Sequence, residues 1–114
     1  MHLILDGNGC NKAALDSFEI VHKILDELPE KVGMKKLSSP HLLRGKSPKG
    51  ITGFIIIEES AIMIHTFPEN NFLSFDLYSC NKFDADLVIE LVKKVFEIKQ
   101  LETKILERSY KNIK

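Results

Sequence analysis

Apolar residues between Ala14 and Leu28 recur at the spacing of one face of a helix. Positions 14, 18, 21, 25 and 28 are apolar, and charged residues fill many of the positions between them. Steps of three and four residues place side chains on the same side of an α-helix, so this stretch predicts an amphipathic helix. Asn11 is a suitable N-cap for it. We expect Pro29 to end it, because proline cannot continue a helix.

A second stripe of the same kind follows Asp84, which is also a suitable N-cap. The stripe consists of Val88, Leu91, Val92 and Val95, and it reaches Ile98 or Lys99. The chain therefore predicts two amphipathic helices, each with one apolar face to bury.

The remaining apolar segments have the length and alternation of β-strands. Residues 2–6 form a short apolar segment that ends in a patch of glycine and asparagine, which favours a turn. Residues 34–43 give a weaker strand pattern, and residues 45–50 an exposed loop. Stronger strands are predicted for residues 51–58, 61–66 and 72–79, with a final short strand at residues 102–108.

The predicted order of elements is β-α-β-β-β-β-α-β. This order indicates an α+β fold, a two-layer sandwich in which an antiparallel β-sheet carries two helices on one face. A chain of 114 residues has the length of one domain, so we expect residues 1–114 to form a single domain. A domain of this size has a small core and gains from pairing with a second copy.

Composition and charge exclude several classes of function. The chain has 16 basic and 16 acidic residues, whereas binding to nucleic acids or acidic membranes usually shows a basic excess. The apolar run at residues 54–57 is too short to cross a bilayer, and the N-terminal segment lacks the pattern of a signal peptide. Cys10 and Cys80 do not make a disulfide framework, and no Cys/His spacing resembles a zinc site. We expect a cytoplasmic protein that binds no nucleic acid, no membrane and no metal.

Candidate chemistry gathers between residues 53 and 80. Glu58, Glu59 and Ser60 lie between two strongly apolar strands, where a tight hairpin turn normally uses Asn-Gly or Asp-Gly. A turn that breaks this preference between well-formed strands is a candidate for a strained or functional site. His65 and Cys80 follow, and their side chains can transfer protons.

Four short segments carry a resemblance to a known family. They are Gly50-Ile51-Thr52-Gly53, Glu59-Ser60, Ile64-His65-Thr66-Phe67-Pro68-Glu69 and Asp76-Leu77-Tyr78-Ser79-Cys80. Together they resemble the signature of the prokaryotic S-adenosylmethionine decarboxylase proenzymes, and the likeness runs from His2 through the second predicted helix. Ser60, His65 and Cys80 have the family's spacing of five and then fifteen residues.

The resemblance implies an enzyme that makes its own cofactor. In this family the serine hydroxyl attacks the preceding carbonyl, here that of Glu59, and the peptide becomes an ester. Loss of the Ser60 α-proton then releases the Glu59 carboxylate, and the remaining dehydroalanine hydrolyses to a pyruvoyl group. The cut would give a β chain of residues 1–59 and an α chain of residues 60–114. The pyruvoyl ketone would form a Schiff base with the substrate amine and withdraw electrons as carbon dioxide leaves.

The same resemblance implies roles for five further residues. Thr52 stands at the family position whose hydroxyl assists processing, and His65 is the base for the α-proton, which suits an imidazole. Cys80 corresponds to the acid that returns a proton to the α-carbon, and strand alternation puts it on the more polar face. Phe67 would stack on the substrate's adenine, and Glu69 would bind its ribose hydroxyls.

Three functions remain open from the sequence. The first is S-adenosylmethionine decarboxylase, which supplies decarboxylated S-adenosylmethionine for spermidine synthesis. The second is ornithine or arginine decarboxylase, since close relatives use the same pyruvoyl mechanism on those amino acids, and Ala61 and Phe67 stand where histidine and tryptophan are common. The third is a non-processing homologue that acts as a binding or regulatory subunit. Family members of this short type pair as (αβ)₂ dimers with sites near the subunit interface, so we expect a homodimer that binds a small-molecule substrate.

Overall fold

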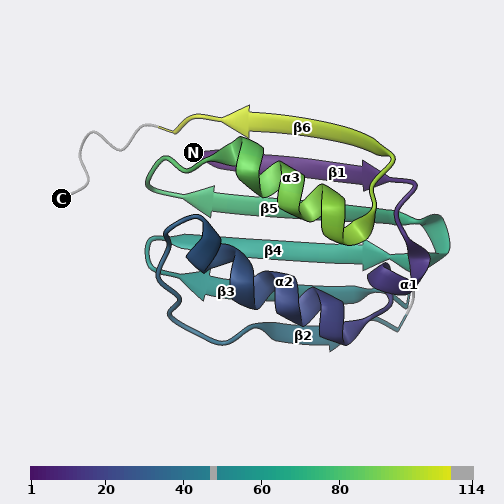
Figure 1. Cartoon of the computed structure of the whole chain (residues 1–114). Coiled ribbons are helices and arrows are strands. Elements are labelled where there is room, and N and C mark those ends of the chain that lie inside the picture. The colour runs from purple at the N-terminus through teal and green to yellow at the C-terminus, as the bar shows by residue number, and fades with distance from the viewer. Residues whose placement is uncertain (47–48, 109–114) are drawn as a thin grey trace.

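The part of the chain that the computed structural model describes, residues 1–46 and 49–108, contains six strands and three α-helices. The strands are β1 (His2–Asn8), β2 (His41–Arg44), β3 (Ile51–Ile57), β4 (Ser60–Phe67), β5 (Phe72–Ser79) and β6 (Gln100–Leu106). The helices are α1 (Lys12–Leu15), α2 (Phe18–Lys31) and α3 (Ala85–Phe96), and a short 3₁₀ turn, η1, spans Pro68–Asn70 (Figure 1).

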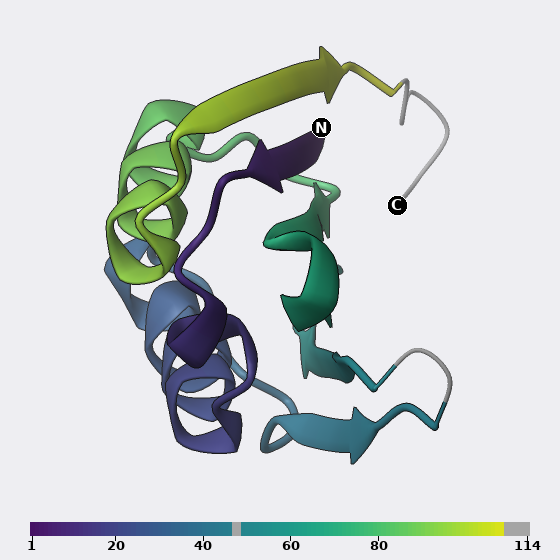
Figure 2. The ribbon, with the colours of Figure 1, turned by 90° about the vertical axis from the view of Figure 1, so that its right-hand side faces the viewer.

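All six strands join one antiparallel sheet in the order β2-β3-β4-β5-β1-β6. Strands β3, β4 and β5 follow one another along the chain and pair as neighbours, whereas β1, the first strand, lies between β5 and β6 (Figure 1). Helices α2 and α3 lie side by side on one face of the sheet (Figures 1 and 2). The predicted α+β sandwich, with two helices on one face of an antiparallel sheet, is confirmed.

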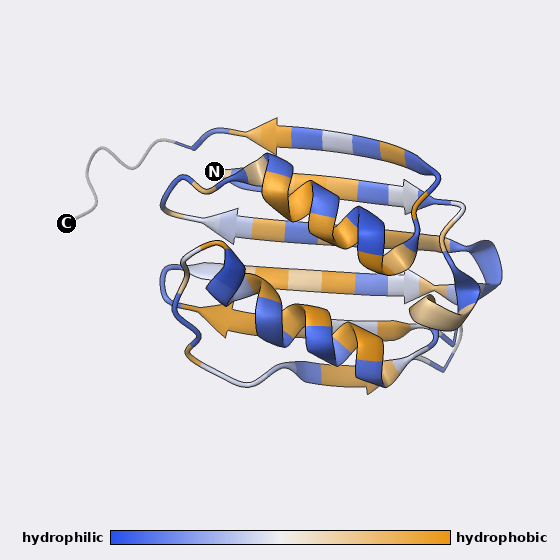
Figure 3. Cartoon of the chain, viewed as in Figure 1, coloured by the Kyte–Doolittle hydropathy of each residue, from blue (hydrophilic) through white to orange (hydrophobic). Residues whose placement is uncertain are grey.

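The hydrophobic core lies between the sheet and these two helices. Alternate residues of the central strands face the helices and are buried, among them Leu3, Leu5, Ile55, Ile62, Ile64 and Leu77. The helices contribute Val21, Leu25, Leu28, Val88, Val92 and Phe96. Hydrophobic and hydrophilic positions alternate along α2 and α3 at the helical spacing (Figure 3). Burying each large apolar side chain contributes about 1.5–3 kcal/mol to the stability of the fold. The burial of these side chains therefore holds both helices against the same face of the sheet.

The other face of the sheet, which we call the open face, carries no α-helix from the described part of the chain (Figure 2). On β3 and β4 it consists of Thr52, Phe54, Ile56, Ala61, Met63, His65 and Phe67. Large apolar side chains on it are exposed to solvent: Leu43 by 72%, Ile56 by 46%, Leu106 by 42% and Met63 by 38%. Large apolar side chains left in solvent on one face of a sheet make that face a candidate contact surface for another protein.

The first predicted helix is divided into two in the structure. Asn11 caps α1 as predicted, because its Oδ1 accepts a hydrogen bond from the backbone N–H of Ala14 at 3.0 Å. However, α1 ends at Leu15, and Ser17 begins α2 by accepting the N–H of Ile20 at 3.1 Å. The chain turns at this second cap, so Phe18 does not join the apolar stripe. Its ring is 41% exposed and lies 4.9 Å from the guanidinium carbon of Arg44.

The prediction that Pro29 ends this helix is wrong. Pro29 lies inside the last turn of α2, which continues to Lys31. A proline there removes only one helical hydrogen bond, and its ring is buried. The helix ends where Gly33 adopts a positive φ of 76°, a conformation that glycine takes at helix C-termini without steric cost.

The other predicted elements differ from the structure mainly at their ends. Asp84 caps α3 as predicted, through an Oδ1 that accepts the N–H of Leu87 at 3.1 Å. The weak pattern at residues 34–43 yields only the short edge strand β2, together with an isolated bridge from Lys36 to Ile57. The last strand begins earlier than predicted, at Gln100. In the predicted loop at residues 45–50, positions 47 and 48 lie outside the described residues.

Within the described residues, no helix is long and apolar enough to span a membrane.

Candidate active site

The turn between β3 and β4 holds its backbone in an unfavourable conformation. Ile57 pairs with Ser60, so Glu58 and Glu59 alone form the turn. Glu59 has a φ of +59°, in the left-handed region where a side chain other than that of glycine costs about 1–2 kcal/mol. The turn that the sequence marks as unsuited to a hairpin is therefore strained at the residue before Ser60.

Ser60 is buried on the helix side of the sheet. Its side chain shares that side with Ile62 and Ile64, and the residue is 9% exposed. The Ser60 hydroxyl donates a hydrogen bond to Ser79 Oγ, with 2.8 Å between the oxygens. Ser79 Oγ also accepts the backbone N–H of Asn81 at 3.0 Å. The candidate nucleophile thus has a fixed, buried partner.

Cys80 contacts the candidate cleavage site through its backbone. Its N–H donates a hydrogen bond to the carbonyl oxygen of Glu59 at 3.0 Å. A donor on that oxygen stabilises the negative charge that develops when the carbonyl carbon is attacked. The Cys80 sulfur lies 3.6 Å from the hydroxyl of Tyr78, a residue whose side chain alternates with the buried Leu77 and lies on the open face.

A cavity of about 220 Å³ lies beside this junction. It is lined by Val32, Gly33, Met34, Lys35, Glu58, Glu59, Ser60, Ser79, Asn81 and Lys82. Two lysines and two glutamates give it a polar, mixed-charge wall. The Glu59–Ser60 peptide is therefore next to a solvent-accessible space even though the serine side chain is buried.

Thr52 and His65 form a second group, on the open face. The two residues pair directly across β3 and β4, and Thr52 Oγ1 is hydrogen-bonded to His65 Nδ1 at 3.0 Å. A hydrogen bond to one ring nitrogen fixes the orientation of an imidazole and leaves the other nitrogen for proton transfer. The same pair lines a cavity of about 220 Å³ together with Gly45, Lys46, Gly50, Thr66 and Phe67.

Phe67 and Glu69 lie at the same end of the sheet as this pair. Phe67 lines the cavity, and its ring centre is 5.6 Å from that of Phe72 at a tilt of 41°. Glu69 is exposed in η1 and is not among the residues lining the cavity. The structure thus brings Phe67, but not Glu69, into the cavity beside His65.

Within one chain the two groups are far apart. Ser60 begins β4, and His65 lies five residues further along the same strand, which corresponds to about 17 Å at the rise of an extended chain. Their side chains also point to opposite faces, since Ser60 is buried among the core residues and His65 lies on the open face. A single copy therefore separates the junction of Glu59, Ser60 and Cys80 from the Thr52–His65 pair.

The sequence interpretation did not identify Ser79 as a site residue. Two signals could have found it: Ser79 is next to Cys80, and in a regular strand it lies on the opposite face from Cys80. A serine on the apolar face of a strand needs a hydrogen-bond partner, because an unpaired buried hydroxyl is costly. The pairing of Ser60 with Ser79 across β4 and β5 supplies that partner.

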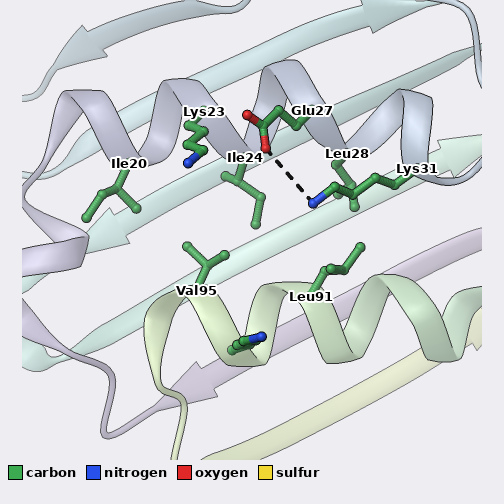
Figure 4. A pocket seen from close by; sticks show the side chains of 9 residues that line it. Ile20, Lys23, Ile24, Glu27, Leu28, Lys31, Leu91 and Val95 are labelled. Carbon is green, nitrogen blue, oxygen red and sulfur yellow. Dashed lines mark ion pairs between the residues drawn. The ribbon is translucent and has the colours of Figure 1, made fainter.

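Other candidate sites are remote from these residues. A cavity of about 450 Å³ lies between α2 and α3, where Ile20, Ile24 and Leu28 face Leu91 and Val95 (Figure 4). Lys31 and Glu27 form an ion pair at its rim. Cys10 is buried, and burial raises the pKa of its thiol. Among the described residues, no group of three or more His, Cys, Asp or Glu side chains could hold a metal ion.

The amino-acid sequence is similar to those of known proteins. A family model described as S-adenosylmethionine decarboxylase matches residues 1–109. A protein of Persephonella marina (strain DSM 14350 / EX-H1) named S-adenosylmethionine decarboxylase proenzyme is 34% identical over 109 residues, which are 95% of this chain and 80% of that protein. A protein of the same name from Clostridium botulinum (strain Langeland) is 32% identical over 108 residues, covering 94% of this chain and 91% of that protein.

The fold is also found in a solved structure. The crystal structure of the adenosylmethionine decarboxylase from Aquifex aeolicus VF5 superposes with a TM-score of 0.78, covering 95% of this chain and 92% of that chain. The two sequences are 21% identical, so this likeness concerns the arrangement of the sheet and helices.

Proposed function

The chain belongs to the S-adenosylmethionine decarboxylase family, and from this premise we propose that it cuts itself between Glu59 and Ser60 and then decarboxylates S-adenosylmethionine. The observation that carries the proposal is the junction itself. Glu59 has a positive φ, its carbonyl oxygen already accepts the N–H of Cys80, and Ser60 is the next residue. This combination supports a strained peptide prepared for attack by the neighbouring hydroxyl.

In the first step Ser60 Oγ attacks the carbonyl carbon of Glu59. The new C–O bond forms, the C–N bond breaks, and the hydroxyl proton ends on the Ser60 nitrogen, so the peptide becomes an ester without gain or loss of atoms. The Cys80 N–H stabilises the oxyanion that forms in between. Release of the strain at Glu59 lowers the barrier further.

In the second step the α-proton of Ser60 is removed and the Glu59 carboxylate leaves. We assign His65 as the base, held by its hydrogen bond to Thr52 Oγ1. The dehydroalanine left on residue 60 takes up water and loses ammonia. The products are a β chain of residues 1–59 and an α chain of residues 60–114 that begins with a pyruvoyl group.

The pyruvoyl group supplies a ketone that takes up the substrate's amine and withdraws electrons as carbon dioxide leaves. The chain's own residues bind the substrate and move one proton. We assign Cys80 as the acid that protonates the α-carbon. We assign Phe67 to the adenine, since it lines the cavity beside His65. Glu69, which is exposed nearby, is assigned to the ribose hydroxyls.

The separation of Ser60 from His65 supports a homodimer with shared sites. Both the Thr52–His65 pair and the exposed apolar residues lie on the open face. A two-fold axis perpendicular to the strands would lay this face on its copy, with each end of one sheet over the opposite end of the other. Thr52 and His65 of one copy would then lie near Cys80 and the junction of the second.

The product of this reaction is decarboxylated S-adenosylmethionine, which we propose is used for spermidine synthesis. Cys80 must remain a free thiol to donate its proton, and both Cys10 and Cys80 are free in the structure. A reducing compartment meets this need, and we therefore propose that the enzyme acts in the cytoplasm.

Intact mass spectrometry of the purified protein under denaturing conditions tests the proposal. We expect two fragments, residues 1–59 and residues 60–114, the second with a pyruvoyl group in place of serine. Ser60→Ala should remain one inactive chain, while Ser39→Ala, a change in the exposed loop before β2, should be cut normally. A single full-length species from the unchanged protein would contradict self-processing.

The substrate is tested separately, with the cut protein and carboxyl-labelled compounds. Labelled carbon dioxide should be released from S-adenosylmethionine and at most slowly from ornithine or arginine. Release mainly from ornithine or arginine would refute the assigned substrate and leave the self-processing step intact.

A further inference from the structure

We propose that Ser79 is a positioning residue for self-cleavage: its hydroxyl oxygen holds the Ser60 hydroxyl so that Ser60 Oγ is directed at the Glu59 carbonyl. The inference rests on the self-cleavage proposed above and adds a residue to it. Among the described residues, Ser79 is the side chain to which Ser60 Oγ is hydrogen-bonded.

The direction of this hydrogen bond matters for the chemistry. Ser60 donates its proton to Ser79 Oγ at 2.8 Å, so the lone pairs of Ser60 Oγ are not used in that contact and remain available for attack. Ser79 therefore orients the nucleophile.

Ser79 is itself held firmly. The residue is 1% exposed, its backbone N–H donates to the carbonyl oxygen of Met1 at 2.9 Å, and its Oγ accepts the N–H of Asn81 at 3.0 Å. Because Ser60 is opposite Ser79 in the sheet, the two hydroxyls meet across neighbouring strands. A partner fixed on rigid strands positions a reacting group better than one on a loop.

The same short segment also supplies the donor to the scissile carbonyl. Ser79 Oγ contacts the nucleophile, and the N–H of Cys80, the next residue, contacts Glu59 oxygen at 3.0 Å. Two consecutive residues of one strand end thus hold both reacting partners of the acyl shift. In that shift the Ser60 O–C bond forms, the peptide C–N bond breaks, and the hydroxyl proton ends on the Ser60 nitrogen.

The test follows cleavage over time after cell-free synthesis of the full chain, with the uncut and cut forms quantified by intact mass. Ser79→Ala should slow the cut at least about tenfold, the effect of one hydrogen bond that positions a reacting group. Ser79→Thr keeps the hydroxyl and should restore most of the rate. Treatment with hydroxylamine, which cleaves esters, should release less product from Ser79→Ala than from the unchanged chain at equal times.

Ser17→Ala is the matched control for lost stability. It also removes a serine oxygen that accepts a backbone N–H, that of Ile20 at 3.1 Å, but it lies at the start of α2 and does not contact Ser60. It should destabilise the fold and leave the rate of cleavage unchanged. Thermal melting of Ser60→Ala and of the double variant with Ser79→Ala, both uncut, checks that the second variant folds.

The outcomes separate this inference from the proposed function. Cleavage of Ser79→Ala at the rate of the unchanged chain would overturn it, and so would a Ser79→Thr variant as slow as Ser79→Ala. An equal slowing by Ser17→Ala would also overturn it, because the effect would then be one of stability. If the unchanged chain itself is never cut, the proposed self-processing fails.

Discussion

The proposed self-cleavage depends on a few residues whose local conformation departs from what their type prefers. Glu59 occupies the left-handed region, and Ser60 places a hydroxyl on the apolar face of a strand. Each departure costs stability on its own. The hydrogen bond of Ser79 to Ser60 and that of the Cys80 N–H to the Glu59 carbonyl offset part of this cost. The folded protein can therefore keep Glu59 in its strained conformation.

A substitution of Thr52 tests the proposed role of His65. Thr52→Val has nearly the same shape and suits a β-strand, but it removes the hydroxyl that is hydrogen-bonded to His65 Nδ1. We expect self-cleavage to slow by roughly ten- to a hundredfold, because an unoriented imidazole is a poorer base. Thr52→Ser should be cut at close to the normal rate.

The measurement is the fraction of cut chain against time, by intact mass. If Thr52→Val is cut as fast as the unchanged chain, the Thr52–His65 hydrogen bond plays no part in processing.

Most of the proposed site residues could be named from the sequence, but their relative positions could not be predicted from it. Ser60 and His65 are five residues apart, which suggests proximity, yet along a strand this spacing separates two side chains and turns them to opposite faces. Motif spacing carries no information about which copy of a chain supplies a residue. Ser79 was missed because its two signals, the place beside Cys80 and the opposite strand face, name no partner, and its proposed role depends on Ser60 of the neighbouring strand.

At the scale of elements, the start of β3 is held unusually close to the end of β4. A Cβ on Gly50 would lie 1.9 Å from the backbone oxygen of Thr66, and the next strand position, Ile51, donates its N–H to Thr66 Oγ1 at 3.0 Å. Thr66 Oγ1 in turn donates to the backbone oxygen of Leu15 at 2.7 Å. This contact fixes the strand ends that carry Thr52 and His65.

Gly50→Ala should therefore be strongly disruptive. The backbone of β3 and β4 must separate to admit the methyl group, at a cost of about 1–3 kcal/mol, and the Thr52–His65 pair should loosen with it. The free energy of unfolding in urea, measured on the uncut Ser60→Ala background, checks the loss of stability.

Gly7→Ala is the comparison for that measurement. Its Cβ would meet Ile98 Cδ1 at 2.8 Å, the end of a flexible side chain that can move. Gly7→Ala should lower the free energy of unfolding clearly less than Gly50→Ala does. If the two variants lose equal stability, the close approach at Gly50 is not the cause of the loss.

Element types were predictable from the sequence because apolar residues recur at helical and strand spacings over whole segments. Element ends were less predictable, since several residues compete to cap or end a helix. Ser17 caps a new helix within an unbroken apolar stripe. Pro29 is accommodated because the helix ends soon after it, at Gly33. In both cases the sequence offers more than one residue that could begin or end the helix. Hydrogen bonds and packing in the folded chain determine which of them does so.

At the scale of the whole molecule, the helices cover one face of the sheet and leave the other with exposed apolar side chains. The two groups of site residues lie at opposite ends of the same strand. The proposed symmetric dimer, formed through the open face with each copy completing the site of the other, would account for both features.

Complementation between two inactive variants tests this explanation. Ser60→Ala and His65→Ala should each remain uncut when expressed alone. Expressed together, they should form mixed dimers with one intact site, and roughly half of the His65→Ala chains should be cut if the copies pair at random.

The control pairs His65→Ala with a Ser60→Ala/His65→Ala double variant, which offers no intact site and should give no cut chain. If co-expression of the two single variants also gives none, each chain uses its own His65 and the shared site is refuted.

The position of β1 between β5 and β6 affects how the protein can refold after the proposed cut. A cut after Glu59 assigns β1, β2 and β3 to one fragment and β4, β5 and β6 to the other, so the fragments are interwoven along three ladders: β3 with β4, and β1 with both β5 and β6. They stay together while folded, but the tether that raised their effective concentration is gone. Refolding of the cut protein then becomes a bimolecular reaction that slows on dilution. Under the proposed self-cleavage, the uncut chain is the form that folds readily, and the cut chain is the form that carries out the reaction.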